Sequence, residues 1–380
     1  MPTRIGILGC GVISGIYIES SQKLDAIECA AVADVEPAAA RYRAEQYDIP
    51  KACSPAELLA DAEIDIVVNL TPNHVHARVG LDIIKAGKHL YSEKPLTVYR
   101  DESACLLSAA ADANLRVGAA PDTFFGGAWQ TARQAIDDGL IGEPFAAMAI
   151  FHARRTPAQM YRRPATSPTR STAPGMVNFR QTASFKYGAS VPFDMGPYYL
   201  HALINLVGPV KRVFGSTKKL FDEVAWFGGP KQKVESPTHA AAVLEFESGL
   251  LCQFVMSGDT YRTDLPNIEL YGTEGSLRCP DPNHFLGPVY LRRADSPEMV
   301  ELECRHSYNQ DSRGVGIADM AVAIRHGRPH RASGEMGAHA VDILNAIHES
   351  SDQGRRIELQ TTCTRPTPLP ASLPNWTIDE

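Results

Sequence analysis

The first third of the chain alternates short apolar runs with amphipathic stretches. The apolar runs cover residues 4–9, 27–33, 65–70, 88–92 and 115–120, and helical patterns lie between them near 12–22, 37–47, 55–61, 74–86 and 99–113. Strands that alternate with helices in this way are typical of a parallel sheet wound with helices on both faces. Ser54, Pro55 and Glu57 mark one helix start, as a capping serine, a proline in the first turn and a glutamate three residues after the cap. We therefore expect residues 1–122 to form a doubly wound Rossmann domain.

After Pro121 the pattern changes to longer strands. A helix is expected over 124–138, ended by Gly139, and a second helical pattern covers 338–349. Strand patterns lie at 145–152, 210–216, 240–246, 250–257, 267–271 and 276–279, and the short connections at 247–249 and 272–275 predict two hairpins. Residues 123–360 are therefore expected to form a second α/β domain with a mostly antiparallel open sheet. Residues 361–380 contain four prolines and predict an extended arm or a disordered tail.

Composition narrows the class of protein. A chain of 380 residues that is 44% apolar and 21% charged suits two globular domains. The formal charge of −7 argues against nucleic acid as a partner. The eight cysteines form no close pair, which predicts reduced thiols rather than disulfides or a metal site. No segment is long and apolar enough to span a bilayer, and the first residues lack a signal-peptide pattern, so we expect a cytoplasmic protein without a membrane partner.

A glycine-rich turn joins the first expected strand to the first helix. It reads Gly9-Cys10-Gly11-Val12-Ile13-Ser14, a variant of the GxGxxG pattern with serine in the third glycine position. The first glycine permits the tight turn, and the second lets backbone N–H groups approach a pyrophosphate at the positive end of the helix. Ser14 is small enough to keep helix and strand close. The turn therefore predicts a dinucleotide site with Gly9, Gly11, Val12 and Ile13 as contacts.

Asp34, which ends the second expected strand, distinguishes between the nicotinamide dinucleotides. A carboxylate at this position accepts hydrogen bonds from the adenosine ribose hydroxyls and repels a 2′-phosphate. NAD is therefore expected in preference to NADP, and Arg41 in the following helix is the residue placed to soften that preference. Asp34 can also cap this helix, and the two roles are compatible.

Two further segments carry a resemblance to a known family. Ser92-Glu93-Lys94-Pro95 ends one expected strand, and Asp194-Met195-Gly196-Pro197-Tyr198-Tyr199-Leu200-His201 lies about 100 residues later. With the glycine turn, they resemble the glucose–fructose oxidoreductase / inositol dehydrogenase / rhizopine-catabolism (Gfo/Idh/MocA) family, from Arg4 to about Leu359. The resemblance implies a Rossmann domain followed by an α/β domain whose open sheet mediates homodimers or homotetramers. It also implies hydride transfer between a nicotinamide and a carbinol carbon of a sugar or cyclitol.

The resemblance assigns Lys94 to the reacting hydroxyl and the nicotinamide ribose, with Glu93 beside it, and makes Lys94-Pro95 a candidate for a cis bond. The usual family pattern Asp-x-Gly-x-His-x-x-Asp is altered, because Tyr198 replaces the histidine and His201 the second aspartate. Some members, glucose–fructose oxidoreductase among them, have tyrosine there. A free tyrosine titrates at about pH 10, and a nearby ammonium favours the phenolate. Lys94 and Tyr198 are therefore a sufficient pair for taking an alcohol proton; His201 as the base, with Tyr198 only binding substrate, is the alternative.

Further contacts are expected at the ends of the strands, where ligands of such sheets bind. Asp194 either binds substrate hydroxyls or caps a helix that begins near Pro197. The remaining candidate cofactor contacts are Thr71, Pro72, Asn73, His76 and Asp122. His76 and its neighbour His74 also suit packing or a helix start.

A basic segment precedes the second motif. Residues 145–193 contain no aspartate or glutamate but carry seven cations: Arg154, Arg155, Arg162, Arg163, Arg170, Arg180 and Lys186. One interpretation is a lid whose guanidiniums bind a carboxylate or phosphate of an acidic sugar. The other is a solvated loop or an arm on another subunit. Lys186, just before Gly188 and the Asp194 motif, is the residue most suited to enter the active site and bind substrate.

The leading hypothesis is an NAD-dependent dehydrogenase that acts on a cyclitol or on C1 or C3 of a monosaccharide or derivative. One alternative is a glycoside-cleaving enzyme that oxidises C3 transiently, eliminates the aglycone and reduces again. Another is a non-catalytic NAD-binding regulator, against which the presence of both Lys94 and Tyr198 argues. We see no His/Cys cluster that predicts a metal.

Overall fold

The computed structural model describes residues 1–152, 186–225, 231–261 and 263–380. The helices and strands, with two short 3-10 turns (η), are β1 Thr3–Leu8, α1 Ser14–Ser21, β2 Ile27–Ala33, α2 Pro37–Tyr47, β3 Ala52–Cys53, α3 Pro55–Ala60, β4 Ile66–Asn69, η1 Asn73–Val75, α4 His76–Lys85, β5 His89–Ser92, α5 Arg100–Asp112, β6 Val117–Ala119, η2 Thr123–Phe125, α6 Gly127–Asp137, β7 Pro144–His152, α9 Val191–Val207, β8 Val210–Lys218, β9 Glu223–Ala225, β10 Lys231–Lys233, β11 His239–Phe246, β12 Leu251–Ser257, β13 Ile268–Gly272, β14 Gly275–Cys279, β15 Tyr290–Arg293, β16 Met299–Glu301, α10 Val315–His326, α11 Gly334–Gln353 and β17 Ile357–Glu358.

The N-terminal region is the expected doubly wound sheet. Its six strands run in the order β3-β2-β1-β4-β5-β6, and every pair is parallel. The central strands are almost continuously apolar because helices cover both faces; Ile5, Ile7 and Val68 are fully buried. Strand order reverses next to β1, so the carboxyl ends of β1 and β4 border the crevice where ligands of such folds bind.

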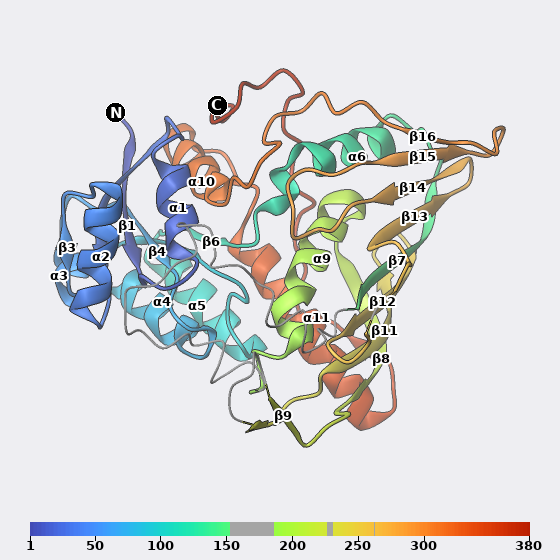
Figure 1. Ribbon diagram of the computed structural model, residues 1–380, viewed down its shortest axis with the longest axis horizontal. Coiled ribbons are helices and arrows are strands. Elements are labelled where there is room, and N and C mark those ends of the chain that lie inside the picture. The colour runs from blue at the N-terminus through green and yellow to red at the C-terminus, as the bar shows by residue number, and fades with distance from the viewer. Residues whose placement is uncertain (153–185, 226–230, 262) are drawn as a thin grey trace.

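The second region is built on a sheet of nine strands, in the order β16-β15-β14-β13-β7-β12-β11-β8-β17. It is mostly antiparallel, with one parallel pair between β7 and β12. Both expected hairpins, β11–β12 and β13–β14, are present. Helices α9 and α11 lie between this sheet and the N-terminal domain (Figure 1), and both carry long runs of buried residues.

The chain returns to the Rossmann domain near its end, which corrects the expected boundary. Helix α10 packs on β6 and β2. The segment after it stays on β6, where the Ala119 N–H donates to the Ala332 carbonyl at 2.9 Å. Residues of the expected second domain, 123–360, therefore complete the first. A segment separated by two hundred residues from its sheet gives no local signal of that pairing.

The C-terminal twenty residues form a packed, extended arm. The Leu369 N–H donates to Gln130 Oε1 of α6 at 2.8 Å, and the Tyr308 hydroxyl donates to the Thr377 carbonyl at 2.5 Å. The Lys23 ammonium of α1 lies 5.1 Å from the Trp376 ring. Of the two expectations for this segment, the extended arm agrees with the structure, and the arm spans both domains. Within the described residues, no helix has the length and apolarity that a membrane span requires.

Candidate functional site

The glycine turn between β1 and α1 has the geometry of a pyrophosphate cradle. Gly9 has a φ of +108°, and a Cβ there would lie 2.7 Å from the Leu70 backbone. Only glycine adopts such a conformation at such a close approach without strain. A Cβ on Gly11, in contrast, would meet no atom within 4 Å. The turn is therefore tight against β4 on one side and open at Gly11, and the half-buried Val12 and Ile13 lead into the N-terminus of α1.

A buried arginine supports this turn from below. The Ser14 hydroxyl donates to the Gly11 carbonyl at 2.8 Å and accepts a hydrogen bond from Arg43 Nε at 2.9 Å. Arg43 Nη2 also donates to the Gly11 carbonyl at 2.9 Å. The arginine is fully buried on α2, and burial lowers its pKa. Sequence reasoning missed Arg43, although its place on the buried face of α2 with Ala39, Ala40 and Ala44 was a signal.

Asp34 stands beside the turn and binds the residue before α2, but it does not cap this helix, whose N-cap residue is Glu36. One carboxylate oxygen accepts the Cys10 N–H at 2.7 Å, and the other accepts the Glu36 N–H at 2.9 Å. The residue is half-buried at the end of β2. Its carboxylate thus joins the glycine turn to the next helix and keeps one side toward solvent. Arg41 is exposed on α2.

The residues after β4 form a hydrogen-bonded corner. The Thr71 hydroxyl donates to Asn69 Oδ1 at 2.6 Å, and Asn73 Nδ2 donates to the Gly188 carbonyl. Thr71, Pro72 and Asn73 are half-buried, so this corner has an open side.

His76 does not share that open side. Its ring nitrogens lie 2.7 Å from the Pro95 and Thr71 carbonyl oxygens, and the residue is 1% exposed. Burial is the main cause that lowers its pKa. The structure therefore gives His76 the packing role and corrects the expectation of a cofactor contact.

The Glu-Lys-Pro segment after β5 is anchored to α1. The Tyr17 hydroxyl donates to Glu93 Oε1 at 2.8 Å, and the Lys94 N–H donates to Glu93 Oε2 at 2.9 Å. Glu93 and Tyr17 are buried, and burial raises the pKa of Tyr17 well above its usual value. The Lys94-Pro95 peptide bond is cis, as the resemblance predicted. Glu93 thus fixes the backbone from which the Lys94 side chain extends.

Lys94 and the α9 motif come together from the two domains. Lys94 Nζ lies 2.5 Å from Asp194 Oδ1 and 2.8 Å from the Asp194 carbonyl oxygen. The same ammonium lies 5.2 Å from the centroid of the Tyr198 ring. Lys94 has only 9% of its side chain exposed, whereas Asp194 keeps 41%. An ammonium, a carboxylate and a phenol therefore share one site.

Helix α9 begins earlier than the sequence predicted. It starts at Val191, with Pro192 in its first turn and Pro197 inside the helix. The Asp194 N–H donates to the Ser190 carbonyl at 2.8 Å, so Asp194 lies within the first turn and is not the cap. Its carboxylate is consequently available to Lys94 and to solvent.

His201 lies one turn further along α9 and is buried. Its Nδ1 is 3.0 Å from the Pro121 carbonyl oxygen, and its ring packs against Phe124. It is 1% exposed, and burial lowers its pKa to about 4. This imidazole anchors α9 to the end of β6 and has no exposed surface for a substrate hydroxyl.

Asp122 is also an anchor rather than a cleft residue. Its Oδ2 accepts the Gly314 N–H at 2.8 Å and the Gly316 N–H at 3.0 Å, at the start of α10. The side chain is fully buried, and burial raises its pKa to about 6. The expectation that Asp122 contacts the cofactor is therefore wrong in this structure, because its carboxylate caps a helix that sequence reasoning did not place there.

The basic segment is described only at its end. Lys186 is exposed in a turn closed by the Ala189 N–H on the Lys186 carbonyl at 3.1 Å. The role of Lys186 in binding substrate stays a prediction. The six arginines Arg154, Arg155, Arg162, Arg163, Arg170 and Arg180 lie outside the described residues.

Arg313 is a second residue that the sequence did not reveal. It lies just before α10, is 5% exposed, and donates hydrogen bonds to Asp311 and Asn283. Burial opposes its charge, but the nearby Tyr198 and Asp311 raise its pKa above the usual value. A loop residue with no periodic pattern around it carries no signal of these contacts.

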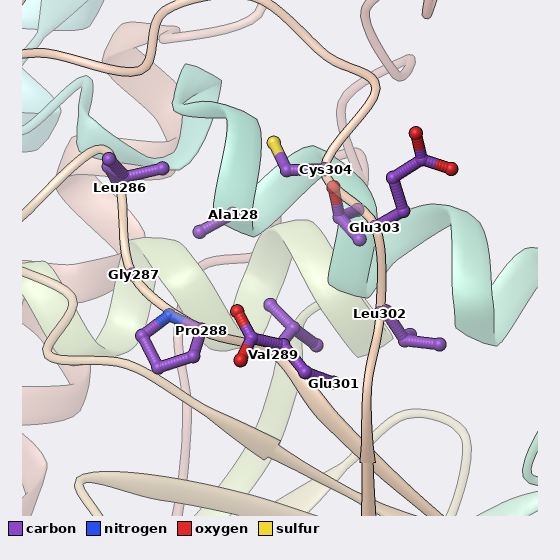
Figure 2. Close-up of a pocket in the computed structure, with 10 residues that line it drawn as sticks. Ala128, Leu286, Gly287, Pro288, Val289, Glu301, Leu302, Glu303 and Cys304 are labelled. Atoms are coloured by element: carbon purple, nitrogen blue, oxygen red, sulfur yellow. The ribbon is translucent and has the colours of Figure 1, made fainter.

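Two cavities of the described residues lie away from these side chains. One, of about 520 Å³, opens between α6 and the segments before β15 and after β16, where Glu301, Glu303 and Cys304 surround it (Figure 2). The other, of about 610 Å³, lies between Tyr99, Tyr187 and the end of α11. Neither cavity is lined by the glycine turn, Lys94 or Tyr198. The candidate site is therefore defined by the contacts among its side chains and not by a cavity. Among the described residues, no group of His, Cys, Asp or Glu side chains is placed to hold a metal.

Comparison with known proteins agrees with this geometry. Residues 3–120 match the profile of the oxidoreductase family with an NAD-binding Rossmann fold, and residues 129–278 match the GFO/IDH/MocA C-terminal domain. The chain belongs to the GFO/IDH/MocA oxidoreductase family. Its N-terminal domain is accordingly an NAD-binding Rossmann fold, and the resemblance to this family is confirmed.

Individual relatives cover nearly the whole chain. The 1,5-anhydro-D-fructose reductase of Ensifer adhaerens is 26% identical over 366 residues, which are 94% of this chain and 99% of the relative. The myo-inositol 2-dehydrogenase of Thermotoga maritima is 23% identical over 360 residues, 94% of this chain and 98% of the relative. An NAD-binding oxidoreductase from Klebsiella pneumoniae has the same fold, with a TM-score of 0.77, 22% identity and coverage of 94% of this chain and 99% of that one.

Proposed function

We propose that the chain is an NAD(H)-dependent dehydrogenase that interconverts a hydroxyl and a carbonyl group of a sugar or cyclitol. One observation carries this proposal: Lys94 of the Rossmann domain meets Asp194 and Tyr198 of α9, with Nζ 2.5 Å from Asp194 Oδ1 and 5.2 Å from the Tyr198 ring. The relatives named above act on anhydrofructose and on myo-inositol, both polyhydroxylated. A regulator has no need of such a proton-transfer group.

The residues present fit NAD. The open space at Gly11 and the N-terminus of α1 accommodate a diphosphate, and Asp34 lies beside the turn for the ribose hydroxyls. Thr71, Pro72 and Asn73 form the half-buried corner where the nicotinamide half would be held. When bound, the nicotinamide supplies the hydride acceptor or donor.

The proton chemistry belongs to the chain's own side chains. We infer that the Tyr198 oxygen takes the proton of the substrate hydroxyl during oxidation and returns it during reduction. The Lys94 ammonium stabilises negative charge on that oxygen and donates a hydrogen bond to the substrate oxygen. Asp194 fixes Lys94 and, with its exposed portion, accepts a hydrogen bond from a neighbouring hydroxyl.

Tyr198 is preferred over His201 as the acid and base. The buried His201 ring is committed to the Pro121 carbonyl, and its lowered pKa of about 4 makes it a weak base. Tyr198 shares its surroundings with Lys94, the cation that this chemistry requires.

The test is reduction of NAD by the purified chain with a panel of aldoses, inositols and glycosides. The proposal is supported if the chain oxidises at least one polyol and the Tyr198→Phe variant loses that activity. Release of an aglycone without net NADH would indicate the glycoside-cleaving alternative. Tight NAD binding with no hydride exchange on any member of the panel would contradict both enzymatic functions.

We further propose that the outer face of the nine-stranded sheet joins subunits into a homodimer or homotetramer. Phe214, Val243 and Leu251 expose 52%, 43% and 50% of their surface, on adjacent strands. An apolar row of this kind on a sheet favours association. Val243→Glu should reduce the mass seen by light scattering, whereas Leu286→Glu, at a comparably exposed position in a loop, should not. The eight free cysteines suit a reducing compartment, and we propose the cytoplasm.

A further inference from the structure

We propose that Tyr17 is a positioning residue, which acts through Glu93 to tie the backbone of Lys94 to the helix that binds the pyrophosphate. This inference rests on the proposed function and adds a component that the glycine turn, the Glu-Lys-Pro segment and the α9 motif do not contain. It makes the orientation of the Lys94 ammonium depend on whether the nucleotide site is occupied.

One carboxylate joins two segments that lie 76 residues apart in the sequence. Glu93 Oε1 accepts the Tyr17 hydroxyl of α1 at 2.8 Å, and Glu93 Oε2 accepts the Lys94 N–H at 2.9 Å. Lys94 Nζ then binds Asp194 Oδ1 on α9 at 2.5 Å. A continuous series of contacts therefore leads from α1, through Glu93 and Lys94, to the second domain.

The link between Tyr17 and Glu93 is enclosed by the protein. Tyr17 is 1% exposed and Glu93 is 8% exposed, so solvent is a poor substitute for either partner. A buried carboxylate is destabilising unless its oxygens accept hydrogen bonds, so the orientation of Glu93 depends on both of its donors. Burial and the neighbouring Glu93 raise the pKa of Tyr17 well above its usual value. Its hydroxyl therefore stays protonated and remains a donor.

The place of Tyr17 on α1 connects this link with the nucleotide. Helix α1 covers Ser14–Ser21 and begins next to the glycine turn, so Tyr17 lies near its N-terminus. A diphosphate bound at this N-terminus restrains the turn and the start of the helix. Restraint of the helix also restrains the Tyr17 hydroxyl and, through Glu93, the backbone of Lys94. We therefore expect NAD to order Lys94 before a polyol binds.

The first experiment compares kcat, the KM for the polyol and the Kd for NAD in the full chain and in Tyr17→Phe, which keeps the buried ring and removes only the hydroxyl. We expect kcat to fall about tenfold, because a displaced ammonium is no longer aligned with the reacting hydroxyl. The Kd for NAD should stay within about threefold, since the backbone of the glycine turn is unchanged.

Tyr308→Phe is the matched control. Tyr308 is also 1% exposed, and its hydroxyl donates to the Thr377 carbonyl of the C-terminal arm at 2.5 Å. The variant thus loses a comparable buried hydrogen bond that does not involve Glu93, and it should keep the kcat of the parent chain. A kcat in Tyr17→Phe that equals that of Tyr308→Phe would overturn the proposal.

A double variant tests whether Tyr17 acts through Glu93. Glu93→Ala removes the carboxylate between the two partners, so adding Tyr17→Phe should cause no further loss of kcat. If the two losses multiply, Tyr17 and Glu93 act independently and the proposal is wrong. If Glu93→Ala does not fold, the exchange measurement below decides the same question.

Hydrogen exchange of the Lys94 amide needs no turnover, and this N–H is the one that donates to Glu93. NAD should slow its exchange about tenfold in the parent chain and only about twofold in Tyr17→Phe. Faster exchange throughout the β1–β6 sheet of Tyr17→Phe, with the effect of NAD on Lys94 unchanged, would indicate a purely structural role and overturn the inference. If the parent chain oxidises no polyol, the proposed function fails, yet this NAD-dependent protection still tests Tyr17.

Discussion

The two ligand-binding regions of the molecule use side chains in opposite ways. Around the glycine turn, Asp34, Ser14 and Arg43 bind the chain's own backbone, at Cys10, Glu36 and Gly11. We call this the nucleotide side. Around α9, the side chains of Lys94, Asp194 and Tyr198 contact one another. We call this the hydroxyl side.

The difference follows from what each ligand offers. A pyrophosphate is bound by backbone N–H groups, so the nucleotide side needs a rigid main chain and uses side chains to hold it. A reacting hydroxyl needs a proton acceptor, so the hydroxyl side keeps ionisable groups together in a partly buried place. Substitutions on the first side should change the affinity for NAD, and substitutions on the second should change turnover.

The largest effect is expected at Lys94. Lys94→Ala removes the cation that contacts both Asp194 and Tyr198, and we expect kcat to fall about 10²- to 10⁴-fold. The backbone N–H of residue 94, which binds Glu93, is unaffected, so the Kd for NAD should change by no more than about threefold. Stopped-flow turnover and fluorescence titration of NADH measure the two quantities. Lys88→Ala is the control, because this lysine lies just before β5 and its ammonium donates to the Asp61 carbonyl.

If weaker NAD binding accounts for the whole loss of turnover in Lys94→Ala, the nucleotide side and the hydroxyl side do not have the separate functions assigned to them. It would show that Lys94 acts mainly as a nucleotide contact, and Asp194→Asn should then be as active as the parent chain.

The two glycines of the turn should respond differently. Gly9→Ala places a Cβ 2.7 Å from the Leu70 backbone at a φ of +108°, so it should lower the free energy of unfolding by about 2–4 kcal/mol. Gly11→Val places its Cβ where no heavy atom lies within 4 Å, so it should leave stability nearly unchanged, while NAD affinity falls by about 10- to 100-fold. Urea unfolding and NADH titration measure the contrast. A Gly11→Val chain that binds NAD normally would place the diphosphate elsewhere.

A substitution of Arg43 tests whether the hydrogen bonds that hold the glycine turn also determine the affinity for NAD. Arg43→Met removes the hydrogen bonds to Ser14 and to the Gly11 carbonyl, and we expect about tenfold weaker NAD binding with kcat at saturating NAD unchanged. Ser14→Ala removes one of these partners and should give a smaller loss of affinity. A change in kcat without a change in affinity would contradict the assignment of Arg43 to the nucleotide side.

The nucleotide side could be predicted from sequence because it is local. Gly9, Gly11 and Asp34 lie within consecutive strand and turn units, and the pattern of apolar runs fixes where those units meet. Lys94 and Tyr198 were found only through the family resemblance, since nothing in their spacing brings two domains together.

The misplaced residues share a physical cause. Asp122, His76 and His201 look like polar strand-end or helix residues in the sequence, yet each is buried against a backbone group from a distant segment. Arg313 depends on the return of α10 to the first sheet, a tertiary contact with no local pattern. Polar residues that satisfy buried backbone groups cannot be distinguished from ligand contacts until the topology is known.

Acid should lower the stability of the fold through its buried imidazoles, which include His76 near the glycine turn as well as residues on α9 and α11. His201 on α9 and His339 and His348 on α11 are buried, and burial lowers the pKa of each to about 4. In the unfolded chain a histidine titrates at about 6.5. Between these values the unfolded chain binds protons that the folded chain does not, so stability present above about pH 6.5 is lost as the pH falls toward about 4.

We expect the Tm to fall by a few degrees between pH 7 and pH 5.5. His348→Gln should lessen that fall, because it removes one of these three imidazoles. The Nε2 atom of His348 has no hydrogen-bond partner among the described residues, so the substitution breaks no hydrogen bond at that atom. The exposed His74→Gln should leave the slope unchanged. A Tm that stays level over this range in the parent chain would show that these imidazoles take up protons within the fold, which would contradict the pKa shifts that burial imposes on them.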